Sequence, residues 1–260
     1  MSAHPYATSH SLVDVDWHGV PAVAKETRRL RGRPGFVQRR SREAEVYTHV
    51  LHPGGVWAPR LLEATTDTVV LERLDTQPLW QFETHAVARR VGEVLRATHD
   101  ALQASVAAQF LVRYDRRYYD RWFRRACVLQ PSVRSLGAAH DVATRHLQAQ
   151  RRIVIHGELY PANVLVHGDD IRFVDWESAG AGPAAIDVAA VTTGWPDDDI
   201  ETLLAGYGEI DRTALECARF HLALRWLGWS STWTPPAEHR RDWVAEARAA
   251  AARFVHKAAA

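Results

Sequence analysis

Cysteine is scarce in this sequence of 260 residues, and its scarcity argues against two kinds of structural site. Cys127 and Cys217 stand far apart, and neither has the neighbours that a zinc site or a redox motif requires. The sequence therefore supports neither a disulfide framework nor a zinc site. We expect both side chains to be core thiols.

The sequence also lacks an excess of charge of either sign and any long apolar run. Lys and Arg number 32 and Asp and Glu 31, so the formal net charge is +1. This balance gives no overall field that would favour a nucleic acid or a membrane surface as a partner. Nowhere do about 18 apolar residues follow one another, and the first residues show no cationic segment before an apolar run. We therefore expect a reduced, soluble, cytoplasmic protein.

What the sequence does contain is enough apolar material for a buried core. Hydrophobic residues make up 47% of the chain, which suits one large domain or two modest lobes. Residues 11–17 and 20–26 alternate between apolar and polar, and His18 and Gly19 between them suit a tight turn. This pattern predicts a β-hairpin with Lys25 on its second strand.

Downstream of the hairpin, the periodicity predicts one helix, a second pair of strands, a linker and two helical regions. The helix begins after Ser41 and places Val46, Tyr47, Val50 and Leu51 at helical spacing. The other predicted segments are the strands 60–64 and 68–71, the linker 72–76, and the helical regions 85–150 and 199–260.

Residues 152–176 hold three short apolar runs separated by two polar loops. The second loop, 167–170, has turn composition and is predicted to join its flanking runs as a hairpin that pairs Val166 with Ile171. This register carries Asn163 opposite Val174, next to Asp175 in the chain.

The mouth of this hairpin therefore brings an amide and a carboxylate together. Because adjacent positions of a strand point to opposite faces, either Asn163 or Asp175 must leave strand geometry there, and Pro161 eases such a departure. The first polar loop ends at Asn163 and brings Glu158 to the same place. Two carboxylates and an amide suit Mg²⁺ together with a base.

Three motifs in this region resemble one family, the aminoglycoside phosphotransferase and choline kinase group of protein-kinase-like enzymes. The run from His156 to Asn163, HGELYPAN, resembles that family's catalytic loop. The run FVDWE at 173–177 resembles its metal-binding segment, and Gly-Pro at 182–183 followed by Asp-Val-Ala at 187–189 resembles the stretch after it. Three linked motifs in this order are a strong signal.

The resemblance implies an α+β, two-lobed, protein-kinase-like fold. Residues 1–74 would form a small antiparallel-sheet lobe with one helix, which binds the nucleotide. Residues 75–260 would form a larger, mainly helical lobe with the catalytic loop and the acceptor site.

The resemblance also implies roles for the residues of the loop and hairpin. Asn163 and Asp175 would coordinate Mg²⁺ bound to the nucleotide phosphates, and Glu158 would stand in the place of the base that accepts the substrate hydroxyl's proton. His156 would shape the loop by hydrogen-bonding backbone, and Asp187 would brace it.

In the smaller lobe, Lys25 resembles the lysine that holds the α- and β-phosphates, and Glu43 resembles its ion-pair partner. Glu45 is the competitor; Glu43 is preferred because apolar residues follow it at i+4 and i+7. Residues 70–74, including Glu72 and Leu74, resemble the hinge whose backbone binds adenine.

Two departures from the family pattern stand out. Glu158 replaces the family's Asp, and Gly19 is the only glycine before Lys25, so no Gly-x-Gly-x-x-Gly loop covers the phosphates. The longer carboxylate would work with a repositioned acceptor or serve as a further metal or substrate contact. The missing loop leaves GTP open beside ATP, and a catalytically weak protein as well.

The leading hypothesis is an enzyme that moves the γ-phosphoryl group of ATP, or GTP, to a hydroxyl of a small polar metabolite or aminoglycoside-like antibiotic. A cationic acceptor is one version of it, because an acidic cluster (Asp197, Asp198, Asp199 and Glu201) could attract an amine; the alternative is that the cluster begins a helix. The second hypothesis is a pseudokinase-like binding module without turnover.

Two further interpretations are disfavoured. A metallohydrolase would use His156, Glu158, His167 and Asp175, but His167 lies at the turn, away from Asp175. A kinase acting on proteins lacks room for an activation loop between Asp175 and Asp187. The tryptophans at helical spacing near the C-terminus are expected to be core and not a stacking surface; they are Trp226, Trp229 and Trp233.

Overall fold

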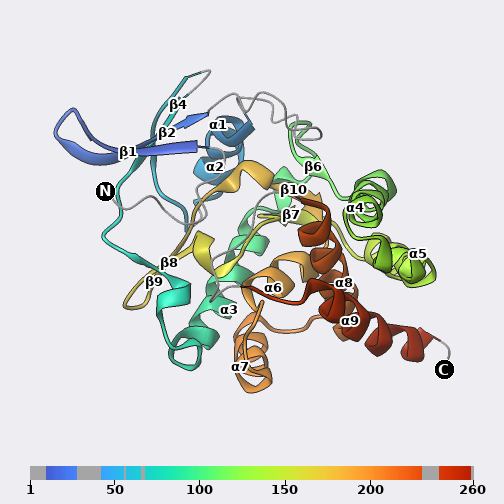
Figure 1. Ribbon diagram of the computed structural model, residues 1–260. Helices are drawn as coiled ribbons and strands as arrows, with labels where there is room; N and C mark the ends of the chain where they lie inside the picture. The colour runs from blue at the N-terminus through green and yellow to red at the C-terminus, as the bar shows by residue number, and fades with distance from the viewer. Residues whose placement is uncertain (1–9, 28–41, 56, 66–67, 230–239, 259–260) are drawn as a thin grey trace.

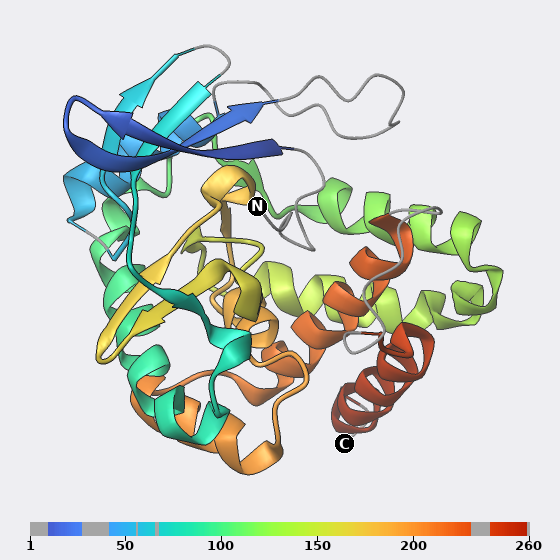
Figure 2. The same cartoon turned by 60° about the vertical axis from the view of Figure 1, so that its left-hand side comes forward.

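A computed structural model describes residues 10–27, 42–55, 57–65, 68–229 and 240–258 of the chain. An antiparallel sheet with a short helical segment comes first, and a mainly helical part follows (Figure 1). Figure 2 shows the same sheet lying over the rest of the molecule, with the helices below and to one side. This order of elements is the α+β arrangement expected from the sequence.

The N-terminal sheet has the strand order β1-β2-β4-β3, and every neighbouring pair is antiparallel. Its strands are β1 (His10–Trp17), β2 (Val20–Thr27), β3 (Leu61–Ala64) and β4 (Thr68–Glu72). The predicted hairpin is confirmed, since His18 and Gly19 form its turn with φ of 51° and 83°. Positive φ at both positions matches the twist of the flanking strands. Lys25 lies on β2, between the neighbouring strands β1 and β4.

The predicted helix after the hairpin is present as three consecutive pieces. They are α1 (Arg42–Val46), a π-helical turn (Tyr47–Leu51) and α2 (His52–Gly54). Val46, Tyr47, Val50 and Leu51 are all buried, as their spacing predicted. The segment ends at Gly55, whose φ of 59° is readily adopted by glycine. The proposed cap, Ser41, lies outside the described residues.

The predicted hairpin in the C-terminal part is also confirmed, with its register. Strands β8 (Val164–His167) and β9 (Asp170–Phe173) pair Val166 with Ile171. The short strand β5 (Gln77–Pro78) adds a third strand beside β8. A separate sheet of three short strands has the order β6-β10-β7; these are β6 (Val112–Arg113), β7 (Ile153–Ile155) and β10 (Gly180–Gly182).

Helices make up most of the C-terminal part. They are α3 (Thr84–Ala101), α4 (Arg116–Leu129), α5 (Gly137–Ala149), α6 (Ala185–Val191), α7 (Asp197–Tyr207), α8 (Arg212–Trp229) and α9 (Trp243–Ala258). Helix α3 packs against α7, whereas α8 packs against α4, α5, α6 and α9. Apolar side chains from all these helices and from β7, β8 and β9 share one buried core.

The cysteines, the helices and the division between the two parts of the chain bear on other expectations from the sequence. Both cysteines are free; Cys217 is buried and Cys127 is half-buried against the core. Among the described residues, no helix has both the length and the apolarity of a membrane span. Sheet membership changes between Glu72 and Gln77, which supports a division of the chain after residue 74, but that division stays a prediction.

Candidate active site

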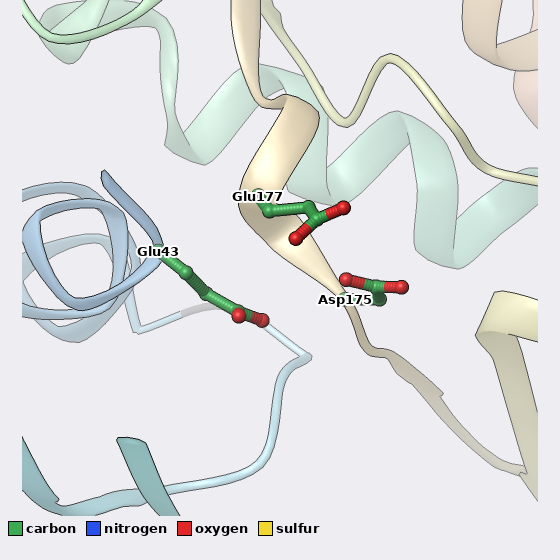
Figure 3. Close-up of side chains that lie close together, drawn as sticks. All are labelled: Glu43, Asp175 and Glu177. Atoms are coloured by element: carbon green, nitrogen blue, oxygen red, sulfur yellow. The ribbon is translucent and has the colours of Figure 1, made fainter. Parts of the chain in front are cut away.

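Lys25 is the centre of an ionic cluster that joins the N-terminal sheet to the C-terminal part; Lys25 and Glu43 are buried, whereas Asp175 and Glu177 are half-buried. Its Nζ lies 2.7 Å from Glu43 Oε2, 2.6 Å from Asp175 Oδ1 and 4.0 Å from Glu177 Oε2. Figure 3 shows Glu43 reaching from α1 toward Asp175 and Glu177, which follow β9. The ion pair between Lys25 and Glu43 that the sequence favoured is therefore present.

The cluster holds more negative than positive charge in a buried place. Burial by itself would lower the pKa of Lys25, but Asp175, Glu43 and Glu177 outweigh it and raise that pKa well above its ordinary value. Burial also raises the pKa of Glu43, against the opposing effect of Lys25. One oxygen of Glu43, Oε1, is buried without a hydrogen-bond partner among the described residues. The ammonium is thus firmly charged, and the site favours a further cation.

Three carboxylates of this cluster could share a metal ion. One oxygen each from Glu43, Asp175 and Glu177 lies within 4.8 Å of the others. Oxygen ligands of this kind suit Mg²⁺, which takes a few protein ligands and keeps water and phosphates for the rest. Glu177 belongs to the FVDWE motif, but no role was predicted for it from the sequence.

The backbone at Asp175 explains how its carboxylate reaches Lys25. Its φ and ψ are 67° and 56°, a left-handed conformation that costs a non-glycine residue about 1–2 kcal/mol. Asn163 ends a 3₁₀ turn, Pro161–Asn163, and its carbonyl accepts a hydrogen bond of 3.0 Å from the Val174 N–H. Both residues at the mouth of the hairpin therefore leave strand geometry, where the sequence required only one to do so.

The catalytic loop is braced by Asp187 at the start of α6. Its carboxylate accepts hydrogen bonds from the N–H of His156 at 2.7 Å and of Gly157 at 2.8 Å. Burial lowers the pKa of His156, so its ring is neutral and its Nε2 donates to the Val174 carbonyl at 2.8 Å. The loop-shaping and bracing contacts expected of these two side chains are confirmed.

Asp187 has a third partner that the sequence did not reveal. His99 of α3 lies with Nε2 at 3.1 Å from Asp187 Oδ2, and its Nδ1 lies 2.9 Å from the hydroxyl of Tyr207 on α7. All three side chains are buried. Asp187 therefore ties the loop to α3 and α7. In the sequence, the only signal for this contact was a histidine on the apolar side of a predicted helix.

Glu158, the expected base, is ion-paired with Arg225 of α8. Arg225 is 4% exposed, and its Nη1 also donates to the Gly157 carbonyl at 2.6 Å. The amide nitrogen of Asn163 donates to the Glu158 carbonyl at 2.8 Å, so its amide oxygen is the atom that could bind a cation. The sequence did not suggest Arg225, because no motif contains it.

Some residues considered from the sequence lie elsewhere. Three members of the acidic cluster, Asp197, Asp198 and Asp199, form the first turn of α7, which packs on α3. Asp199 accepts a hydrogen bond from Thr84, and Glu201 pairs with Arg212. The helix-start interpretation of this cluster is thus supported. His167 pairs with Asp170 at the far end of the hairpin, which removes the geometry for a metallohydrolase.

The hinge residues have structural contacts that leave their proposed role open. Glu72 accepts a hydrogen bond of 2.9 Å from the Arg60 N–H, and the N–H of Arg73 donates to the Pro21 carbonyl at 3.0 Å. Adenine binding by the backbone around Glu72 and Leu74 stays a prediction.

The tryptophans form a half-buried aromatic group next to the loop. Trp226 stacks on Trp243 of α9, with ring centroids 5.4 Å apart and planes 7° apart. The ring centroid of Tyr160 lies 5.1 Å from the ring centroid of Trp226. Trp229 is half-buried against the core, as expected, whereas Trp226 is half-buried among these aromatic rings and is not part of the core; Trp233 lies outside the described residues.

A sequence model described as the phosphotransferase enzyme family matches residues 26–221, well over half of the chain. Among curated protein sequences, none matches significantly.

Three solved structures show the same fold. The macrolide 2'-phosphotransferase MphH from Brachybacterium faecium has a TM-score of 0.66 and 19% identity, over 96% of this chain and 90% of that one. Choline kinase LicA from Streptococcus pneumoniae has a TM-score of 0.65 and 14% identity, over 95% of this chain and 90% of that one; LicA has also been solved with AMP. A choline/ethanolamine kinase family protein from Mesorhizobium loti has a TM-score of 0.60 and 17% identity, over 95% and 87%. The predicted two-lobed, protein-kinase-like fold is therefore confirmed.

Proposed function

Because the chain belongs to the phosphotransferase enzyme family, we propose that it moves the γ-phosphoryl group of ATP, or GTP, to a hydroxyl of a small polar molecule. Metabolites such as choline or ethanolamine and antibiotics are the acceptor classes, as the names of its structural relatives suggest. The observation that carries the proposal is the convergence of Lys25, Asp175 and the loop that ends at Asn163. The AMP complex of LicA supports a nucleotide as the donor.

The oxygen donors of the site fit Mg²⁺. Asp175 and Asn163 would hold it, with Glu177 within reach and the unpartnered oxygen of buried Glu43 adding negative charge. When bound, Mg²⁺ would neutralise charge on the phosphate oxygens.

The protein's own residues supply binding and positioning, which dominate phosphoryl transfer. The ammonium of Lys25 offers hydrogen bonds to the phosphates. The acceptor oxygen forms a bond to the γ-phosphorus while the bond from that phosphorus to the bridging oxygen breaks. The nucleoside diphosphate leaves with the electron pair, and the hydroxyl proton passes to the carboxylate of Glu158.

The alternative is a nucleotide-binding module without turnover. It is favoured by the ion pair that already engages Glu158 and by the absence of a glycine-rich loop before Lys25. Both candidates predict nucleotide binding, so a turnover assay must separate them.

The test is a screen for transfer from γ-labelled ATP and GTP, with Mg²⁺, to choline, ethanolamine, aminoglycosides, macrolides and spectinomycin. We expect at least one labelled acceptor, and a loss of turnover of about 100-fold or more in Asp175→Asn, because a misplaced or missing charge at the reacting group costs on that order. Asp170→Asn is the matched control, since Asp170 lies at the opposite end of the same hairpin. Its kcat should stay within about twofold, as for other surface substitutions away from the site.

Two results would reject the enzyme. Nucleotide binding that depends on Mg²⁺, without transfer to any acceptor, would support the binding module. Absence of nucleotide binding would reject both candidates.

A further inference from the structure

Arg225 lies on α8 and makes three contacts, two with the catalytic loop and one with α4. Its Nη1 donates to the Gly157 carbonyl at 2.6 Å, and its Nη2 pairs with a carboxylate oxygen of Glu158. Its guanidinium carbon lies 5.5 Å from the centre of the Trp122 ring on α4, a cation–π distance. Only 5% of the side chain is exposed. The guanidinium is therefore held in one position by groups from two sides.

A buried guanidinium needs a negative partner. Taking an ion out of water costs several kcal/mol unless an opposite charge and hydrogen bonds compensate it. Glu158 provides that charge, and its own side chain is 18% exposed, more than that of Arg225. The charge on Arg225 thus depends on Glu158, and the position of the Glu158 carboxylate depends on Arg225.

The length of the residue at position 158 decides whether this pair can form. The family motif has Asp there, whose carboxylate is one carbon–carbon bond closer to the backbone, roughly 1.5 Å. The backbone cannot move to compensate, because Asp187 holds the N–H groups of His156 and Gly157. An aspartate at this position would leave Arg225 buried without its anion.

We infer that Arg225 is a positioning residue that holds the carboxylate of Glu158 at the acceptor hydroxyl, so that the two residues act as one unit. This inference rests on the proposed function and deepens it. It explains the departure from the family motif: the longer side chain and the arginine compensate for one another. It follows that restoring the family's aspartate harms this enzyme.

If Arg225 had a purely structural role, the kcat values of the variants would combine differently. Its hydrogen bond to the Gly157 carbonyl would tie α8 to the loop whatever residue stands at position 158. In that case the effects of changing Glu158 and Arg225 would be independent, and their losses in kcat would multiply.

The test is a kinetic double-mutant cycle with Glu158→Asp, Arg225→Met and the double variant, using the acceptor found in the screen. Each single change should lower kcat about 10- to 100-fold, as expected for a displacement near 1 Å, with the nucleotide KM within about twofold of the wild type. The double variant should lose no more than the worse single variant. Arg225→Lys, which keeps the charge, should retain more activity than Arg225→Met.

Arg125→Met is the control for general damage at this interface. Arg125 lies on α4, contacts the same Trp122 ring at 5.6 Å and donates to the Gly228 carbonyl at 2.7 Å. Its kcat should stay within about twofold of the wild type, a typical result for a change outside the site. All assays are run well below the Tm of the least stable variant, so that loss of folded protein does not mimic loss of kcat.

The outcomes separate this inference from the proposed function. Glu158→Asp with wild-type kcat, or a double variant whose loss equals the product of the single losses, overturns the inference alone. A wild-type protein without turnover on any acceptor overturns the proposed function, and the inference with it.

Discussion

Gly157 shows what a single residue decides at this site. It has a φ of 82°, and a Cβ atom there would lie 2.3 Å from the Tyr114 hydroxyl and 2.6 Å from the Ser178 carbonyl oxygen. Only glycine meets both demands, the left-handed backbone and the close approach. The loop can therefore present the Gly157 N–H to Asp187 while the carboxylate of the next residue, Glu158, pairs with Arg225.

We predict that Gly157→Ala lowers kcat by about 100-fold or more, because the loop must shift by an amount that misplaces Glu158. Gly168→Ala is the matched control, since Gly168 also has positive φ but has open space around it. The control should lose only about 1–2 kcal/mol of stability to backbone strain, with kcat nearly unchanged. Equal kcat for both variants in the transfer assay would contradict this account.

At the scale of elements, the interface between α4 and α8 buries a titratable group. His221 of α8 lies edge-on to Tyr119 of α4, with ring centroids 4.7 Å apart. Its Nε2 is buried without a partner among the described residues. Burial, with a smaller effect of His140, lowers the pKa of His221 to about 3.

Because the pKa of His221 is lowered, the free energy of unfolding should fall as the pH falls. A lowered pKa means that the folded state prefers the neutral ring, so the stabilisation is complete above the unfolded pKa near 6.5 and is lost as the pH falls toward 3. Between pH 7 and pH 5 the loss from this one group is about 2 kcal/mol.

We therefore predict that His221→Phe, which keeps an aromatic ring in the interface, reduces the loss of stability between pH 7 and pH 5 by about 2 kcal/mol. Urea unfolding at the two pH values measures it. His52→Gln serves as the control, because His52 is exposed on α2 and should leave the wild-type difference unchanged. An unaltered pH dependence in His221→Phe would show that the α4–α8 interface admits water at this ring.

At the scale of the whole molecule, the cluster around Lys25 links the N-terminal sheet to the C-terminal part. Lys25 comes from β2, Glu43 from α1, and Asp175 from the segment after β9. Asp175 is 150 residues from Lys25 in the sequence, and the fold brings the two within ion-pair distance. Nucleotide binding should therefore depend on both parts together.

We predict that Lys25→Met lowers the Tm and removes the stabilisation by Mg²⁺ and ATP, since it leaves Glu43 buried without its cation and takes a donor from the phosphates. A ligand at 100 times its Kd adds about 2.7 kcal/mol, which is roughly 5–10 °C for a chain of this size. Thermal unfolding with and without Mg²⁺ and ATP measures the difference.

Arg90→Met controls for loss of a cation away from the nucleotide site. Arg90 is exposed on α3 and lies 3.2 Å from Glu93, an ion pair of the kind worth about 0–1 kcal/mol. It should keep the full shift with nucleotide. A shift in Lys25→Met as large as in the wild type would mean that Lys25 does not contact the nucleotide.

Much of the candidate site could be predicted because its residues belong to short, local patterns. The register of the β8–β9 hairpin follows from its turn, and that register brings Asn163 to Asp175. The pairing of Lys25 with Glu43 was predicted from the resemblance and from helical spacing. Glu177 and Arg225 were not predicted, since nothing in their local sequence marks them as part of a site.

The sequence by itself determined the α+β fold, the family, the hairpins and the loop. Turns, alternation and motif spacing act over a few residues, so they can be recognised without the tertiary contacts. Only the tertiary structure decided which partners Glu158 and Asp187 meet. Arg225 reaches Glu158 and His99 reaches Asp187 through contacts between distant helices and the loop. Such partners are chosen by the need to compensate a charge or a polar group removed from water, and that need appears only once the chain is folded.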